Sequence, residues 1–244
     1  MLVLHRRNLC AVLLTAMAGL ASGPALASDG RSSAPSAVVR AEASRPGGLE
    51  PPNAAQFTRL CSNTADLVEC GKKIEAEWLR KPGASTIVRR QGRFLAVSIP
   101  GDVPYIFEDQ PGEAGPDVSF YGYVAAADAA VLYRARGDRL DFLVLDRATG
   151  SVTDLPNEPR FNHDGRYFAT ADFCKDGCEN RLAVWRFERR GAVRERVFAP
   201  RVPWDDAEVS WGSPTRLIVD ITEAGRSSSI NLELRDPRWV ILLP

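Results

Sequence analysis

Beyond its first residues, the sequence has little of what catalysis or cofactor binding requires. It contains neither G-x-G-x-x-G nor G-x-x-x-x-G-K-[ST], so nucleotide binding has no support. It has no G-x-S-x-G, and His163 is the single histidine after His5, which leaves a serine–histidine–aspartate triad one candidate base. Basic and acidic residues number 31 each, which gives no support for nucleic acid or an anionic membrane as partner. We expect no cofactor and no metal.

Residues 1–27 predict a secretory signal peptide. Arg6 and Arg7 form a basic start, residues 9–20 are an apolar run, and Ala25-Leu26-Ala27 is a small-residue cleavage site. The alternative is a membrane anchor, but the apolar run is shorter than the roughly 20 residues that span a bilayer. Cleavage removes two basic residues and no acid, which changes the net charge from 0 to −2. We expect a periplasmic or secreted protein with no membrane insertion after cleavage.

The mature chain keeps four cysteines: Cys61, Cys70, Cys174 and Cys178. An even number in an exported chain favours two disulfides, for which three pairings are possible. We expect the local pairing, which joins the first two and the last two. A zinc site of four thiolates is the alternative, but the C-x8-C and C-x3-C spacings differ from the C-x2-C typical of zinc. In "FCKDGCENRLAVW" the second pair would close a β-hairpin tip, and a calcium site there would lack the D-x-D-x-D-G pattern.

Two segments precede the rest of the chain. Residues 28–56 are rich in Ser, Ala, Pro and Gly, which predicts a disordered tether. Residues 57–84 predict one α-helix, with Asn63 or Thr64 as cap and Pro82-Gly83 as its end. Four residues at spacings of three and four share one face of this helix: Leu67, Cys70, Ile74 and Trp78. We expect this face to pack on the domain, with a disulfide holding the helix; the alternative is that it fills a groove on a partner.

Residues 85–244 predict β-structure, because short apolar runs alternate with turns rich in Gly, Pro, Asp and Asn. Four turn–strand pieces recur, at 91–96, 128–133, 164–169 and 214–219. Second strands are expected at 105–108, 142–145, 182–187 and 230–234, and third strands at 151–155, 193–198 and 239–242. The steps between equivalent turns are 37, 36 and 50 residues. A period of about 40 residues with three or four short strands is the size of a propeller blade.

Two stretches carry a resemblance to a known family. "FNHDGRYFA" (161–169) resembles the S-P-D-G-(K/R)-x-(L/I/F)-A start of TolB-type and WD40-like propeller blades, although Asn162-His163 replaces Ser-Pro. "LVLDRATGSVTDL" (143–155) resembles the strand, turn and strand that follow in such blades. The "CGKKIEAEWLRK" helix ahead of these repeats also resembles exported bacterial proteins. The resemblance implies a mainly β fold of about four blade-like antiparallel units after one α-helix, forming a small propeller or an open stack.

A few side chains could act in binding or catalysis. Asp164-Gly165 is typical of a tight turn, so we expect His163 beside it to turn the chain rather than to catalyse. Trp211 occupies the position of Phe161 in the preceding unit and is expected in the core. Five residues are candidate partner contacts, with the tryptophan expected to be exposed: Trp204, Asp205, Asp206, Lys175 and Asp176.

Three functions agree with these observations. The first is a non-catalytic exported module that binds or scaffolds a protein partner in the cell envelope. The second is an inhibitor or immunity-type protein that blocks a periplasmic or secreted enzyme, for which a stapled loop is suited. The third is a hydrolase with acidic catalytic residues, which would need acids converging in one pocket with a raised pKa.

Overall fold

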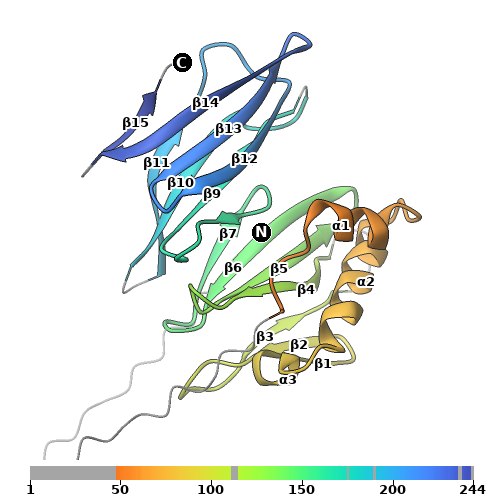
Figure 1. Cartoon of the computed structure of the whole chain (residues 1–244). Coiled ribbons are helices and arrows are strands. Elements are labelled where there is room, and N and C mark those ends of the chain that lie inside the picture. Colours follow the sequence, from red (N-terminus) through yellow and green to blue (C-terminus); the bar gives the residue numbers. More distant parts are fainter. Residues whose placement is uncertain (1–47, 111–114, 175, 189–190, 236–237, 243–244) are drawn as a thin grey trace, which may run out of the picture. The chain divides into compact units, whose positions relative to one another are not determined.

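A computed structural model describes residues 48–110, 115–174, 176–188, 191–235 and 238–242, in which a few helices precede four antiparallel β-sheets (Figure 1). The predicted mainly β fold is confirmed, and the set of sheets is not closed. The predicted signal peptide and residues 28–47 of the predicted tether lie outside the described residues.

Each sheet consists of strands that follow one another along the chain. Sheet 1 contains β1 (Val88–Gln91), β2 (Phe94–Val97) and β3 (Tyr105–Glu108). Sheet 2 contains β4 (Asp117–Val124), β5 (Ala129–Arg136), β6 (Arg139–Asp146) and β7 (Ser151–Leu155). Sheet 3 contains β8 (Arg160–Phe161), β9 (Tyr167–Asp172), β10 (Arg181–Glu188) and β11 (Gly191–Phe198). Sheet 4 contains β12 (Asp206–Ser213), β13 (Arg216–Glu223), β14 (Arg226–Arg235) and β15 (Arg238–Leu242).

The strands expected from the sequence are present, but the first strand of every sheet was missed. These strands are β1, β4, β8 and β12. The central residues of β4 are buried on both faces of sheet 2, so it shows no alternation of apolar and polar residues. β8 is only two residues long. Neither strand gives the two-residue period from which a strand is predicted.

The predicted helix is present as α2 (Leu67–Leu79), but it is not the single one, because the described residues also form α1 (Ala54–Cys61) and α3 (Ala84–Ile87). α1 begins with a capping box, in which the Asn53 side chain accepts from the Gln56 backbone N–H and the Gln56 side chain accepts from the Asn53 N–H. This cap lies within the segment that the sequence assigned to the tether.

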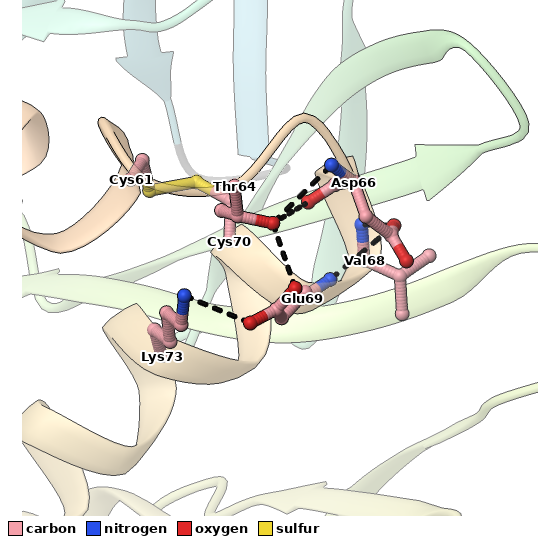
Figure 2. The surroundings of a disulfide bond; sticks show 7 residues. All are labelled: Cys61, Thr64, Asp66, Val68, Glu69, Cys70 and Lys73. Carbon is pink, nitrogen blue, oxygen red and sulfur yellow. Dashed lines mark hydrogen bonds and ion pairs between the residues drawn. A yellow bond between two sulfur atoms is a disulfide. The ribbon is translucent and has the colours of Figure 1, made fainter.

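α2 is capped by Asp66 rather than by the predicted Asn63 or Thr64. The Asp66 carboxylate accepts from the Val68 backbone N–H at 2.8 Å (Figure 2). The Thr64 hydroxyl instead donates to the Glu69 carboxylate at 2.8 Å. The predicted Cys61–Cys70 disulfide is present and joins the last residue of α1 to the first turn of α2 (Figure 2).

The predicted apolar face of α2 packs on the domain. Cys70, Ile74 and Trp78 are at most 3% exposed. α2 approaches sheet 2 so closely that a Cβ on Gly71 would lie 2.8 Å from the Tyr133 ring. Glycine therefore allows the helix to contact the β5 side chain directly.

The end of the predicted tether is ordered, which corrects the boundary placed at residue 56. Leu49 is 1% exposed, and its carbonyl accepts from the Trp78 indole N–H at 3.1 Å and from the Tyr123 backbone N–H at 2.6 Å. Pro51 lies so close to Gly122 of β4 that a Cβ there would be 2.5 Å from the proline nitrogen. Composition did not indicate that residues 48–56 are ordered, because their order depends on one leucine and a few backbone contacts.

The described residues form two hydrophobic cores that hold the sheets together, and sheet 3 contributes to both. Phe168 of β9 belongs to the core that also contains sheets 1 and 2 and α2. Its neighbours Tyr167 and Ala169 belong to the core shared with sheet 4. Successive side chains of a strand point to opposite faces, so sheet 3 packs between sheets 2 and 4.

A buried ion-pair cluster joins α2 to sheets 1 and 2. Arg90 of β1 makes two hydrogen bonds to the Glu75 carboxylate, at 2.8 and 2.7 Å, and a third to Asp109 at 2.9 Å. Glu75 also accepts from the Phe120 backbone N–H at 2.8 Å. Burial opposes the charge of Arg90, but Glu75 and Asp109 outweigh burial and raise the pKa of Arg90. Removal of one member of this cluster would therefore leave a buried charge without its partner, which destabilises the fold.

Turns at the strand ends join one sheet to the next. Arg147, after β6, donates to the Ser98 carbonyl at 2.6 Å and pairs with Asp128 at 2.6 Å. Gly165, after β8, approaches the turn between β4 and β5, where a Cβ would lie 2.5 Å from the Ala127 backbone nitrogen. The buried Asn162 amide donates to the Pro214 carbonyl at 2.9 Å, in the turn between β12 and β13. Each sheet thus contacts the next through backbone groups as well as through its core.

Candidate functional site

The described residues enclose a cleft of about 790 Å³, which we call the β8–β12 cleft. Its walls come from residues 50–54, the end of β4, the segment 158–163 and the segment 208–214. β8 and β12 are edge strands of sheets 3 and 4, and both line the cleft. Its volume lies within the range of pockets that hold small molecules or short peptide segments.

Glu158 and Arg160 form the polar centre of this region. They make an ion pair of 2.8 Å, and Glu158 also accepts a hydrogen bond from Tyr121. Burial raises the pKa of Glu158, and the charge of Glu208 raises it further, while Arg160 and Tyr121 act in the opposite direction. Burial and the Glu158 carboxylate together raise the pKa of Tyr121. Two smaller hollows of about 290 and 90 Å³ share both Glu158 and Arg160 with the cleft.

Aromatic and proline side chains form the apolar wall of the cleft. Phe161 and Trp211 are half-buried, and both line it. The Trp211 indole N–H donates to the Arg160 carbonyl at 2.7 Å, which ties the end of β12 to β8. Trp211 also packs edge-on against Trp239, with 5.9 Å between ring centroids. The prediction that Trp211 belongs to the core is therefore correct in part, because this half-buried side chain packs against the core and also lines the cleft.

His163 lies in a turn, as the sequence predicts. The Asp164 carboxylate accepts from the Arg166 backbone N–H at 2.9 Å, and Gly165 has a φ of +69°. His163 is exposed and lines the rim of the cleft. Asp164 serves the turn through its bond to the backbone, and it is absent from the cleft lining. The Asn162–His163 pair, which departs from the resembled pattern, places an amide in the sheet 3–sheet 4 contact described above.

Among the predicted partner contacts, the exposure of Trp204 was wrong. Trp204 is 7% exposed because its ring packs at a tilt on Phe173 and Phe198, at centroid distances of 4.7 and 5.7 Å. Asp205 and Asp206, which follow it, are exposed. The two prolines and two aspartates around Trp204 suggested a surface loop, but Phe173, which follows β9, and Phe198, the last residue of β11, cover its ring.

The hairpin tip between β9 and β10 has the predicted Cys174–Cys178 disulfide. Asp176 at this tip is exposed, and Lys175 lies outside the described residues. Phe173 directly precedes the tip and packs on Trp204, so the stapled tip and the 204–206 segment are neighbours. Neither segment lines the β8–β12 cleft.

Glu158, Arg160 and Glu208 were missed by the sequence reasoning, although the chain carried a signal for two of them. Glu158 stands three residues before Phe161, and Glu208 stands three residues before Trp211. Phe161 and Trp211 are equivalent positions of successive units, so the two acids are equivalent as well. The equivalence of Phe161 and Trp211 is therefore also the signal in the sequence that Glu158 and Glu208 belong to one site.

The described residues contain no group of three or more His, Cys, Asp or Glu side chains that could hold a metal ion. In the same part of the chain, no helix has the length and apolar character needed to span a bilayer. Comparisons with protein-family models, with curated proteins and with solved structures gave no match. The resemblance to TolB-type blades therefore stays a prediction.

Proposed function

We propose that this chain is a non-catalytic exported module that binds an extended segment of a protein partner in the β8–β12 cleft. The observation that carries the proposal is the position of the cleft, which is lined by two edge strands, an aromatic wall and carboxylates. An edge strand offers backbone groups that its own sheet leaves unpaired, and peptides commonly bind proteins along such strands.

Export is supported by the disulfides and by the predicted signal peptide. Two disulfides indicate an oxidising compartment, because cytosolic thiols are kept reduced. The predicted signal peptide directs the chain to the periplasm or outside the cell. We therefore place the partner in the cell envelope.

Hydrolysis by acidic residues is a second candidate function, favoured by one observation. Glu158 has a raised pKa, and Glu208 lines the same cleft. A carboxyl group with a raised pKa beside an ionised one is the arrangement that acid-catalysed hydrolases use. In this chain, however, Glu158 is paired with Arg160 at 2.8 Å, which favours the ionised form over the proton-donating one.

The test is a crosslinking pull-down from the cell envelope with residues 28–244 as bait. Ser210 is exposed, lies on β12 and lines the cleft, so Ser210→Trp should block it. Ser227 is exposed on the same sheet but is absent from the cleft lining, which makes Ser227→Trp the matched control. We expect the wild type and the control to capture one stoichiometric protein that the blocked variant loses. Equal capture by all three baits would contradict the proposal.

A further inference from the structure

The lining of the β8–β12 cleft has an excess of negative charge. It contains three carboxylates, from Glu50, Glu158 and Glu208, and one guanidinium, from Arg160. Arg160 is paired with Glu158 at 2.8 Å, so its charge is already compensated. The N-terminal end of α1 also reaches the cleft, but its capping box already satisfies backbone N–H groups there. Among the described residues of the lining, no cation is left to compensate the charges of Glu50 and Glu208.

Glu208 is the carboxylate best placed to act on a ligand. It is exposed on β12, and within the described residues its carboxylate makes no hydrogen bond or ion pair. Burial is the main cause of the raised pKa of Glu158, and the charge of Glu208 adds to it. Like charges that share a cleft repel each other, and a cation placed between them would remove this repulsion.

The apolar wall is suited to the aliphatic part of such a cation. Phe161 and Trp211 are half-buried side chains with ring surface at the cleft. Aromatic faces attract cations, and the methylene groups of lysine and arginine pack on apolar surface while their charged ends reach polar groups. The remaining volume, with Pro51, Pro159 and Pro214 on its walls, leaves space for the residues beside the cation.

We infer that the β8–β12 cleft selects a lysine or arginine side chain of the bound segment, with the cationic group between Glu158 and Glu208 and the aliphatic stem against Trp211. This inference rests on the proposed function, because it names the residue class that the bound segment must contain. An acidic segment would meet the uncompensated carboxylates and is excluded by repulsion.

The test is a titration followed by the NMR signal of the Trp211 indole N–H, which reports directly from the cleft wall. The probes are acetyl-Ala-Pro-Lys-Val-Ala-amide and the same peptide with arginine, norleucine or glutamate in place of lysine. Norleucine keeps the aliphatic stem and removes the charge. We expect the lysine and arginine peptides to bind about tenfold more tightly than the norleucine peptide, and the glutamate peptide to bind most weakly.

Glu208→Gln should abolish the difference between the lysine and norleucine peptides. Glu223→Gln, at an exposed acid outside the cleft, should preserve it. Equal affinity of the lysine and norleucine peptides for the wild type would overturn the inference while leaving the proposed cleft function in place. Binding of n-butylamine as tight as that of the lysine peptide would overturn the assignment to a peptide. Loss of the proposed function would appear instead as capture unaffected by Ser210→Trp.

Discussion

Replacing Gly165 by alanine tests how closely sheet 3 contacts sheet 2. Gly165 has a φ of +69°, and a Cβ at this position would lie 2.5 Å from the Ala127 nitrogen and 2.6 Å from the Ala126 carbonyl carbon. These are backbone atoms, so the contact cannot be relieved by a rotamer change. Gly150 is the matched control, because its φ is +70° and nothing lies within 4 Å of its Cβ position.

The magnitudes separate the two effects. Alanine in the left-handed region costs about 1–2 kcal/mol, and this cost is common to both variants. The entropy that alanine removes from the unfolded chain is also common to both and cancels in the comparison. Overpacking against backbone atoms costs a further ~1–3 kcal/mol, which applies to Gly165→Ala alone. In a chain of this size each kcal/mol lowers the melting temperature by roughly 2–4 °C.

We therefore expect Gly165→Ala to melt about 6 °C below Gly150→Ala, measured by differential scanning calorimetry at one pH and one protein concentration. Both variants should melt below the wild type. If the two variants have the same melting temperature, the backbone contact between the turns of sheets 2 and 3 does not exist in solution, and the stacking of the sheets described above is wrong.

Three further predictions concern the helix, the cleft and a disulfide. Glu75→Gln removes the charge that pairs with the buried Arg90, and it should lower the free energy of unfolding by about 3 kcal/mol in urea titrations. Glu77→Gln, at a more exposed ion pair of α2, is the control and should lower it by less than ~1 kcal/mol. Equal losses would refute a special role for the buried cluster. The pKa of Glu158 is raised by folding, so the folded state binds a proton more tightly than the unfolded state, and stability should fall as pH rises from the ordinary value of 4.5 through the raised one. Glu158→Gln should flatten this part of the curve of melting temperature against pH, and an unchanged slope would contradict the assignment. Cys70→Ser should lower stability by ~2–3 kcal/mol under oxidising conditions and should have little effect in a reducing buffer, where an equal effect in both would count against the bond.

The sequence predicted those features of the fold that depend on local pattern. The face of α2 that carries Ile74 and Trp78 follows from helical spacing, and it is buried as expected. The turn at Asp164-Gly165 follows from the conformational freedom of glycine and the hydrogen bond that aspartate accepts. The even cysteine count predicted two disulfides, and the structure has the local pairing that was expected among the three possible ones.

Features that depend on distant partners were not predictable in the same way. Trp204 is buried because Phe173, which is far from it in the sequence, packs on its ring together with the nearby Phe198. Residues 48–56 are ordered because the Trp78 indole and the Tyr123 amide bind the Leu49 carbonyl. The β8–β12 cleft exists because the fold brings two edge strands together, and no local pattern in either strand encodes that approach.

Photo-crosslinking in the cell envelope tests whether a partner segment binds in the β8–β12 cleft. A photoreactive amino acid would replace the exposed His163 at the rim of the cleft, where it does not fill the space as a bulky residue at position 210 would, or Ser227 on sheet 4 outside the cleft. We expect position 163 to crosslink to one stretch of a single protein, with a lysine or arginine in that stretch, and position 227 not to do so. Crosslinks of the same identity and yield from both positions, or none from position 163, would show that no partner segment binds in the cleft.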